Sequence, residues 1–398
     1  MKMRTLGRTG CTVFPLGMGC MRLPVQGEGM SPVDEERSQQ VIYAAIDQGV
    51  NYLDTAPVYH DGTAETVLGR ILGDYRDKVY LATKMSRGAV HSRQDCRELV
   101  DEQLRRLRTD HIDMYLLHNV KPDSWEDFQS FGALEAIEKA RDQGKVVHVG
   151  FSSHADTPFF REILDAHDWD FCQIQFNYLD HRIQAGEEGL QEARSRGLGV
   201  VIMEPLKGGF LARQDLFFQS MLQDDRGWSP AEWALRWLWN REDVDLVLSG
   251  MNSLSQVEEN CRIARNCLPG SMNEADLGLL AEVKEEVGRR LRAPCSGCAY
   301  CMPCPEGLNI PRMLTLYNEV FLQGDATWSK TMYNMCTEES ALAKHCVACG
   351  RCEEICPQSL PISTIMAETH RMLDGSNVDK EVLSSTFSIA FQNKLKYR

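Results

Sequence analysis

Residues 50–59 read Val50-Asn51-Tyr52-Leu53-Asp54-Thr55-Ala56-Pro57-Val58-Tyr59, an apolar run that ends on a carboxylate and is followed five residues later by a phenol. The stretch predicts a buried strand that delivers Asp54 and Tyr59 into the loop after it. Two later apolar runs also end on titratable side chains, namely Lys84 and His118. We therefore expect successive strands to bring an acid, a phenol, an amine and an imidazole together for proton transfer.

Similar apolar runs recur along the first 270 residues, separated by segments with helical spacing. Gly17 and Gly19 resemble part of a dinucleotide fingerprint, but the third glycine is absent and no helix follows at once, which disfavours a Rossmann loop. Eight strand–helix units in about 260 residues, with strands too apolar for a one-sided sheet, predict a (β/α)8 TIM barrel after a hairpin that turns at Thr9-Gly10. The expected strands cover residues 15–20, 50–54, 79–84, 112–118, 146–151, 171–176, 199–204 and 245–250.

The first expected helix carries boundary signals of its own. Ser31 precedes Pro32, and Glu35 follows within the first turn, which together predict an N-cap, a proline at the first helical position and a capping-box glutamate. Gly49 is placed to end this helix.

Length and composition bound the kind of protein. The chain has 398 residues, which favours two domains, and its contents of 43% hydrophobic and 25% charged residues are ordinary for a globular protein. The net charge of −14 argues against nonspecific binding to nucleic acid or to an anionic membrane. No window approaches a membrane span, and the first residues lack the apolar region of a signal peptide. A cytoplasmic location is expected.

The four titratable side chains form a plausible acid catalyst. A tyrosine has a reference pKa of ~10 and needs a nearby cation to protonate a carbonyl oxygen near neutral pH. Lys84 would supply that cation, Asp54 would hold the lysine, and His118 would orient the carbonyl. Each residue alone also has an ordinary structural explanation, as a helix cap, a rim aromatic, a solvated lysine or a satisfied polar group. Their occurrence on consecutive strands favours the catalytic interpretation.

The motif Asp54-Thr-Ala-x-x-Tyr59, the Lys84 strand and the Leu-Leu-His118 strand resemble the aldo-keto reductase family over roughly residues 3–265. The resemblance implies a barrel that moves a hydride between a nicotinamide cofactor and a carbonyl. It also implies that Tyr59 is the general acid and that Lys84, Asp54 and His118 complete the catalytic set.

By the same resemblance, Ser152, Ser153 and Gln173 would hold the nicotinamide carboxamide. Many members place a tyrosine after the seventh strand to stack on the nicotinamide, whereas this chain has Met203, which would cover the ring less rigidly. The neighbouring residues expected to contact the cofactor are Pro205 and Leu206.

The loop after the eighth strand is similar to the family's adenosine-phosphate loop and keeps Asn260. Gly250 and Gln256 stand where members that prefer NADP carry a lysine and an arginine for the 2′-phosphate. The loss of two cations favours NADH, although Arg262 and Arg265 are candidates to compensate. The cofactor is therefore expected to be NAD(P)H, with a preference for NADH.

Eight of the 15 cysteines lie in two short runs near the C-terminal end. The second run has the spacing C-x2-C-x2-C-x3-C-P of a [4Fe-4S] site, and the first departs from it by one residue before its last cysteine. Zinc is the alternative, but its sites commonly use two separated C-x2-C pairs. The cysteines are Cys295, Cys298, Cys301 and Cys304 in the first run and Cys346, Cys349, Cys352 and Cys356 in the second.

In two-cluster ferredoxins, the first three cysteines of one run share a cluster with the fourth cysteine of the other run. That arrangement would place Cys356 with the first run and Cys304 with the second. The long spacer between the runs contains helix-like segments, so we expect a small, mainly α-helical ferredoxin-like domain. The expected domains are a barrel over 1–270, a linker helix over 271–293, a two-cluster domain over 294–370 and a tail over 371–398.

Two functions remain open from the sequence. The first is an NAD(P)H-dependent oxidoreductase that reduces a small carbonyl substrate, with two [4Fe-4S] clusters that transfer electrons. A ferredoxin or a flavoprotein is then a candidate redox partner. The second is a redox partner or scaffold subunit of an electron-transfer complex, with incidental carbonyl turnover and structural or sensing clusters.

Overall fold

The computed structural model describes residues 3–27, 32–213, 216–335 and 337–375. Most of the tail expected over 371–398 lies outside the described residues. The chain divides into two compact units, one formed by Met1–Leu206 with Ala231–Leu277 and the other by Lys207–Pro230 with Gly278–Arg398. The sequence-based domain boundaries remain predictions.

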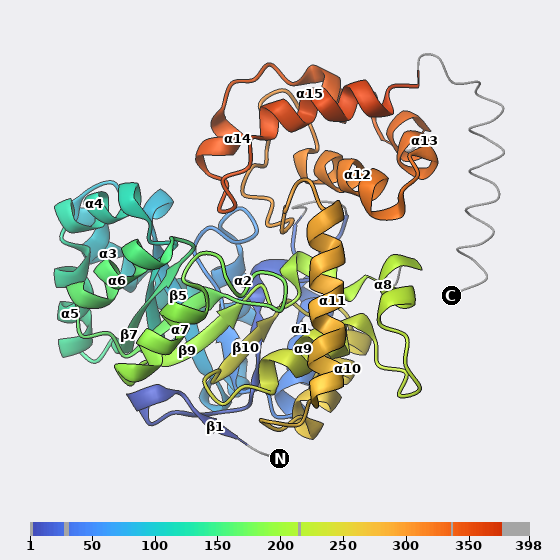
Figure 1. Cartoon of the computed structure of the whole chain (residues 1–398). Coiled ribbons are helices and arrows are strands. Elements are labelled where there is room, and N and C mark those ends of the chain that lie inside the picture. The colour runs from blue at the N-terminus through green and yellow to red at the C-terminus, as the bar shows by residue number, and fades with distance from the viewer. Residues whose placement is uncertain (1–2, 28–31, 214–215, 336, 376–398) are drawn as a thin grey trace. The chain divides into compact units, whose positions relative to one another are not determined.

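The first unit contains a closed barrel of eight parallel strands, in the order β10-β3-β4-β5-β6-β7-β8-β9 (Figure 1). This confirms the predicted (β/α)8 barrel. The predicted hairpin is also present, since β1 (Arg4–Thr5) pairs antiparallel with β2 (Thr12–Val13). The barrel strands are β3 (Leu16–Gly19), β4 (Tyr52–Asp54), β5 (Tyr80–Ser86), β6 (Ile112–His118), β7 (Val146–Ser153), β8 (Phe171–Gln175), β9 (Gly199–Met203) and β10 (Leu246–Ser249).

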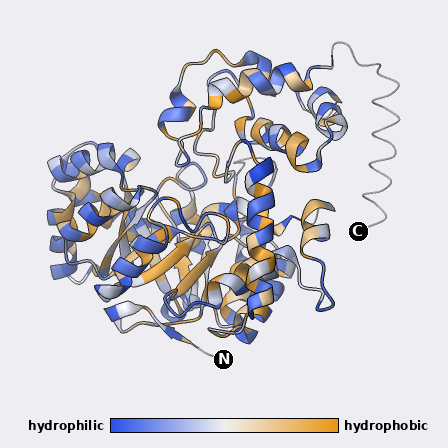
Figure 2. Ribbon diagram, viewed as in Figure 1, coloured by the Kyte–Doolittle hydropathy of each residue, from blue (hydrophilic) through white to orange (hydrophobic). Residues whose placement is uncertain are grey.

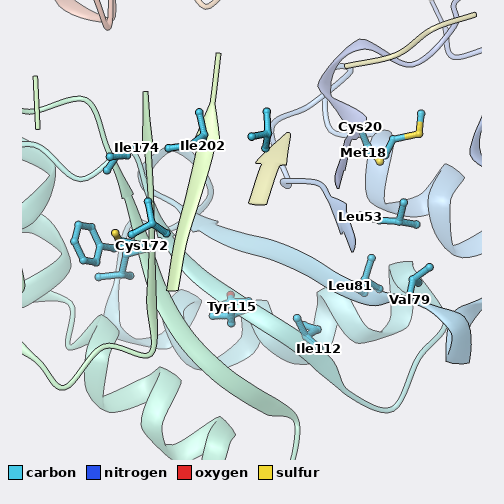
Figure 3. Close-up of a cluster of buried hydrophobic side chains, with 14 of the residues drawn as sticks. Met18, Cys20, Leu53, Val79, Leu81, Ile112, Tyr115, Cys172, Ile174 and Ile202 are labelled. Atoms are coloured by element: carbon cyan, nitrogen blue, oxygen red, sulfur yellow. The ribbon is translucent and has the colours of Figure 1, made fainter. Parts of the chain in front are cut away.

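The strands are apolar on both faces because one face fills the barrel and the other supports the helices. Along β6, Met114 and Leu116 belong to the cluster that fills the barrel, whereas Tyr115 and Leu117 belong to the larger cluster between strands and helices. Figure 3 shows part of that larger cluster, including Tyr115. In Figure 2 the strands are largely hydrophobic, whereas the surrounding helices carry both hydrophobic and hydrophilic residues.

Helix α1 (Glu35–Asp47) begins later than expected. Its N-cap is Asp34, whose side chain accepts a hydrogen bond from the Arg37 backbone N–H. Because the helix starts after Asp34, the predicted start was wrong by about one turn. The predicted N-cap, Ser31, lies outside the described residues. The other helices of this unit are α2 (Ala64–Ile71), α3 (Arg93–Leu107), α4 (Pro122–Ser130), α5 (Ala133–Asp142), α6 (Thr157–Ala166), α7 (Gly186–Ser195), α9 (Pro230–Trp239) and α10 (Leu254–Asn266), with short 3-10 turns η1 (Gly7–Thr9), η2 (Cys20–Arg22), η3 (Gly73–Lys78) and η4 (Arg87–Ala89).

In the described part of the second unit, every regular element is a helix, as predicted for a mainly α-helical ferredoxin-like domain. The segment Lys207–Pro230 belongs to this unit although it follows a barrel strand. Arg213 of that segment pairs with Glu319 at 3.1 Å, and the Arg290 guanidinium lies 5.3 Å from the Phe217 ring. The elements are η5 (Lys207–Ala212), α8 (Leu216–Met221), α11 (Glu274–Arg290), α12 (Ile310–Gln323), α13 (Thr327–Met335), η6 (Glu339–Ala341), η7 (Ala343–His345), α14 (Arg351–Glu354) and α15 (Ile362–Leu373), of which α11 starts in the first unit.

A small core of its own holds the helices of the second unit together. Met313 and Leu316 of α12 pack in this core with Tyr333 of α13 and with Ile365 and Met366 of α15. No helix in the described ranges is both long enough and apolar enough to span a membrane.

Candidate active site and cluster ligands

The four predicted catalytic residues meet at the carboxyl ends of β4, β5 and β6. Asp54 ends β4, Tyr59 lies in the loop after it, Lys84 lies on β5 and His118 ends β6. All four side chains are buried, with residue exposures between 1% and 8%. The register pairs Lys84 with Leu116, so the lysine and the histidine sit at neighbouring levels of the barrel.

The Lys84 ammonium contacts three other groups of the site. Its Nζ lies 2.6 Å from Asp54 Oδ1, 2.6 Å from the Thr55 carbonyl oxygen and 3.3 Å from the Tyr59 hydroxyl oxygen. Burial raises the pKa of Asp54, whereas the Lys84 ammonium acts in the opposite direction. A buried ammonium beside a phenol stabilises the phenolate that remains after the phenol has donated its proton.

His118 packs against the phenol ring. The rings of Tyr59 and His118 are 6.0 Å apart and almost perpendicular, at 83°. Burial lowers the pKa of His118 well below its usual value, and the Lys84 ammonium and then His154 add to the effect. The imidazole is therefore neutral at neutral pH, and it acts through hydrogen bonds rather than through charge.

A buried polar network behind β5 fixes the backbone of Lys84. The Gln103 amide on α3 donates to the Lys84 carbonyl oxygen at 2.9 Å and to Glu65 Oε1 at 2.7 Å. Thr83 also donates to this Glu65 oxygen, at 2.6 Å, and the Tyr115 hydroxyl donates to the Gln103 amide oxygen at 2.7 Å. Because Glu65 lies on α2, just after the loop that carries Tyr59, the network links that loop to the lysine strand.

The Tyr59 loop is held by backbone of unusual conformation. His60, Asp61 and Gly62 all have positive φ, at 50°, 52° and 83°. The buried His60 ring accepts a hydrogen bond from the Leu23 backbone N–H at 3.1 Å. Left-handed backbone is costly for residues other than glycine, so this turn is held by its surroundings, which places Tyr59 firmly.

Two of the three residues expected to hold the carboxamide have free capacity. Gln173 is buried and its side-chain oxygen has no hydrogen-bond partner, and Ser152, its register partner on β7, accepts from the Asn119 backbone N–H at 2.8 Å while keeping its own hydrogen. Ser153 differs, because its hydroxyl donates to the Val120 carbonyl oxygen at 2.7 Å and accepts from the Ala155 backbone N–H. An acceptor and a donor side by side fit a primary carboxamide.

The remaining cofactor candidates lie at the ends of β9 and β10. Met203 ends β9 half-buried, and the adjacent Pro205 is buried, whereas Leu206 is half-buried. The Asn260 amide is buried and donates to the Ser249 hydroxyl at 3.0 Å, which ties α10 to the end of β10.

The two arginines considered as substitutes for the missing phosphate ligands are engaged elsewhere. Arg262 pairs with Glu232 at 2.6 Å, and Arg265 donates to the Gln48 carbonyl oxygen at 2.7 Å. A Cβ built on Gly250 would lie 3.3 Å from the Arg22 Cβ, so the Arg22 side chain runs beside this glycine. Arg22 is a nearby cation that the sequence pattern did not reveal.

A cavity in the second unit gathers cysteines from both runs. Its walls include the apolar side chains of Pro311, Leu314, Leu360 and Ile362. The pKa of the Cys301 thiol is raised to about 12, mainly by burial and then by the neighbouring thiols of Cys298 and Cys295. Thiolates in such surroundings need the positive charge of bound iron, so the donor set fits an iron–sulfur cluster. The cysteines that line the cavity are Cys295, Cys298, Cys301 and Cys356.

In the second run, Cys346, Cys349 and Cys352 lie close enough to one another to interact electrostatically. Burial raises the pKa of Cys352 to about 11, followed in effect by Glu353, with Cys346 and Cys349 also contributing. Cys349 is exposed. Within the described ranges, no three cysteine, histidine or carboxylate side chains are placed to hold a single metal ion. A cluster instead takes its thiolates on different irons, around a cavity.

A sequence model of the aldo/keto reductase family matches residues 15–275, which is more than half of the chain. The chain belongs to the aldo/keto reductase family. A second sequence model, the 4Fe-4S dicluster domain, matches residues 294–361, so this aldo/keto reductase also carries a dicluster domain.

Known relatives agree with this assignment. The NADH-specific methylglyoxal reductase of Escherichia coli is 25% identical, over 73% of this chain and 100% of its own. An aldo-keto reductase of Bacillus halodurans in its holo form has a TM-score of 0.59 and 26% identity, covering 71% of this chain and 96% of its own. An aldo-keto reductase of Klebsiella pneumoniae in complex with NADPH shares the fold, with a TM-score of 0.58 and 22% identity over 71% of this chain and 96% of its own. This aldo/keto reductase is accordingly an NAD(P)-dependent oxidoreductase.

The sequence did not reveal the residues that support the four predicted catalytic side chains. Glu65 and Gln103 lie on helices, where nothing in the local pattern distinguishes them from surface residues. Ser86 had a weak signal, because it follows Lys84 by two residues on a strand and therefore points to the same side. Its hydroxyl oxygen lies 2.5 Å from His118 Nδ1.

Proposed function

We propose that this protein reduces a small carbonyl compound with NAD(P)H and that Tyr59 is the general acid. The observation that supports it most is the buried Lys84 ammonium, which lies 2.6 Å from Asp54 and 3.3 Å from the Tyr59 hydroxyl oxygen. These contacts lie at the carboxyl ends of the strands, where TIM-barrel enzymes place their chemistry.

In this proposal each residue of the site has its own role. When bound, the reduced nicotinamide supplies a hydride to the carbonyl carbon. Tyr59 donates its hydroxyl proton to the carbonyl oxygen, which yields an alcohol, and the phenolate takes a proton back from solvent. Lys84 stabilises that phenolate, Asp54 holds the lysine in place, and neutral His118 donates a hydrogen bond to the carbonyl oxygen. Ser152 and Gln173 hold the carboxamide of the cofactor.

Transfer of deuterium tests the reaction directly. With NADH deuterated on one face of nicotinamide C4 and a panel of aldehydes and ketones, we expect one of the two labelled epimers to deliver deuterium to the alcohol carbon. Mass spectrometry of the product, under anoxic conditions, provides the measurement. Alcohol without deuterium from either epimer would refute direct hydride transfer.

We also propose a preference for NADH over NADPH, because Arg262 and Arg265 are committed to other partners. Exposed Gln256 stands near the start of α10, where its amide oxygen accepts a hydrogen bond from the Asn252 backbone N–H at 2.8 Å. We expect Gln256→Arg to raise kcat/KM for NADPH about tenfold, since a charge-assisted hydrogen bond contributes roughly 1.5–3 kcal/mol. Steady-state kinetics with both cofactors measures the change.

Ser255→Arg is the matched control, because it adds the same charge one residue away on the same exposed turn. It is expected to change the NADPH to NADH ratio much less than Gln256→Arg does. A wild-type enzyme that already prefers NADPH would contradict the proposal and would point to Arg22 as the cation that serves the phosphate.

For the clusters we propose electron transfer with a ferredoxin or flavoprotein partner. A hydride carries two electrons, whereas each cluster accepts one, so direct exchange with the nicotinamide requires a further carrier such as a flavin. The rival proposal is a redox partner or scaffold subunit with incidental carbonyl turnover, in which the clusters are structural or act as sensors. Reversible one-electron reduction of both clusters by a ferredoxin or flavodoxin would support the first proposal.

The shared cavity makes a specific prediction about which cysteines serve which cluster. The protein purified without oxygen is expected to hold about eight irons and eight sulfides per chain. Cys298→Ala and Cys356→Ala should each remove the same EPR signal and about half of the iron, and the double variant should lose no more. Cys349→Ala should remove the other signal. If Cys356→Ala matched Cys349→Ala instead, the pairing across the two runs would be wrong.

A further inference from the structure

Ser86 contacts the imidazole of the proposed site through a short hydrogen bond. It is the last residue of β5, and the β5–β6 register places it directly opposite His118. Its hydroxyl oxygen lies 2.5 Å from His118 Nδ1. Both residues are buried, with exposures of 4% and 8%. The contact is therefore shielded from water and made by two rigid strand ends.

A neutral imidazole carries one N–H, and the partner of each nitrogen decides where it is. His118 is buried and lies close to the Lys84 ammonium, which disfavours a second proton on the ring. If Nδ1 accepts from Ser86, the hydrogen is on Nε2. If Nδ1 instead donates to Ser86, Nε2 presents a lone pair, which repels a carbonyl oxygen.

We propose that Ser86 is a positioning residue that donates its hydroxyl hydrogen to His118 Nδ1 and so holds His118 as the Nε2–H tautomer. In this tautomer, Nε2–H donates to the substrate's carbonyl oxygen beside the Tyr59 proton. This second part rests on the proposed carbonyl reduction, whereas the tautomer itself does not. The serine also restrains rotation of the ring, whose edge-to-face contact with Tyr59 depends on its orientation.

The nitrogen-15 shifts of His118 test the tautomer without any turnover. In the full-length chain labelled at histidine, we expect the wild type to show Nε2 protonated and Nδ1 unprotonated. The signal is assigned by its loss in His118→Asn. Ser86→Ala should shift both nitrogens toward a mixture of tautomers, and Ser86→Thr, which keeps a hydroxyl, should restore the wild-type pattern. Should the threonine variant fail to fold, Ser86→Cys replaces it as a weak donor with an intermediate pattern.

Kinetics tests the role at the carbonyl. We expect Ser86→Ala to lower kcat about 10- to 100-fold, the range seen when the hydrogen-bond partner of a metal-ligating histidine is removed. Cofactor affinity should change little, and Ser86→Thr should recover the activity. Ser195→Ala is the control, because the Ser195 hydroxyl bonds the Glu192 carbonyl oxygen at the end of α7 and has no part in the site.

The outcomes separate the two proposals. A wild-type His118 protonated at Nδ1, or shifts unaffected by Ser86→Ala, would overturn the positioning role even if deuterium transfer occurs. The expected shifts together with an absence of carbonyl turnover would uphold the tautomer and refute its use at a carbonyl. The expected shifts with the expected loss of kcat would support the whole proposal.

Discussion

Tyr59→Phe is expected to lower kcat for carbonyl reduction by about 10²- to 10⁴-fold, the usual contribution of a positioned general acid. The substitution removes the hydroxyl that lies 3.3 Å from the Lys84 ammonium and keeps the ring that lies against His118. Cofactor affinity should stay unchanged, because the phenol hydroxyl is assigned to the carbonyl and not to the nicotinamide. Single-turnover reduction with the best carbonyl of the panel, combined with fluorescence titration of NADH, measures both quantities.

Tyr75→Phe is the matched control, since it removes a hydroxyl that bonds Asp47 on the helical side of the barrel. It should leave kcat within the error of the wild type. Turnover that survives in Tyr59→Phe would exclude this tyrosine as the acid. It would also favour the rival function, in which the barrel reduces carbonyls only incidentally.

Lys84→Met is expected to destabilise the barrel by about 3–5 kcal/mol at neutral pH, because it leaves a buried carboxylate without its cation. Asp54 is 2% exposed and its second carboxylate oxygen has no hydrogen-bond partner even in the native site. The same variant should lose carbonyl reduction, since the phenolate of Tyr59 loses its neighbouring charge. Hydrogen exchange of the β4 and β5 amides reports the stability of the barrel separately from that of the cluster unit.

A second substitution separates stability from catalysis. Asp54→Leu added to Lys84→Met removes the unpaired charge, so stability should return toward the wild-type value while turnover stays absent. Lys145→Met is the control, because its ion pair with Asp101 is partly exposed and should contribute less than about 1 kcal/mol. If Lys84→Met alone cost as little as this control, the pair would not be buried in the way described.

The cost of Lys84→Met should also depend on pH. Burial already raises the pKa of Asp54, and loss of the ammonium raises it further. An acid whose pKa is higher in the folded state than in the unfolded state binds a proton on folding, so its folded form is favoured at low pH and penalised as pH rises. The destabilisation should therefore shrink as the pH is lowered from neutral toward the unfolded pKa of Asp, about 3.9.

The sequence predicted the barrel well because its strands are buried on both faces. Each of the eight apolar runs became a barrel strand, although most boundaries moved by one or two residues. The start of α1 was less predictable. Ser31 and Asp34 are both good caps, and which one begins the helix depends on packing that a local pattern does not contain.

The sequence predicted the residues proposed to act on the substrate, but it did not predict the residues that hold them in place. Asp54, Lys84 and His118 end or nearly end apolar runs, so parallel strands must bring them to one rim. Ser86 and Gln103 act through the register of β5 with β6 and through a helix packed behind β5. Their partners are distant in sequence, and only the folded chain shows which atoms meet.

Because the second unit is built from two separated segments, its contacts can form only late in synthesis. Its first segment, Lys207–Pro230, leaves the ribosome roughly 50 residues before Gly278, a delay of a few seconds at ordinary rates of synthesis. During that time Phe217 has not yet met Arg290, and Arg213 has not yet met Glu319. In a protein truncated after the barrel, the segment Lys207–Pro230 would never meet these partners. We expect this segment to be prone to aggregation and proteolysis. The second unit therefore cannot be removed by a single cut in the chain without leaving part of it behind.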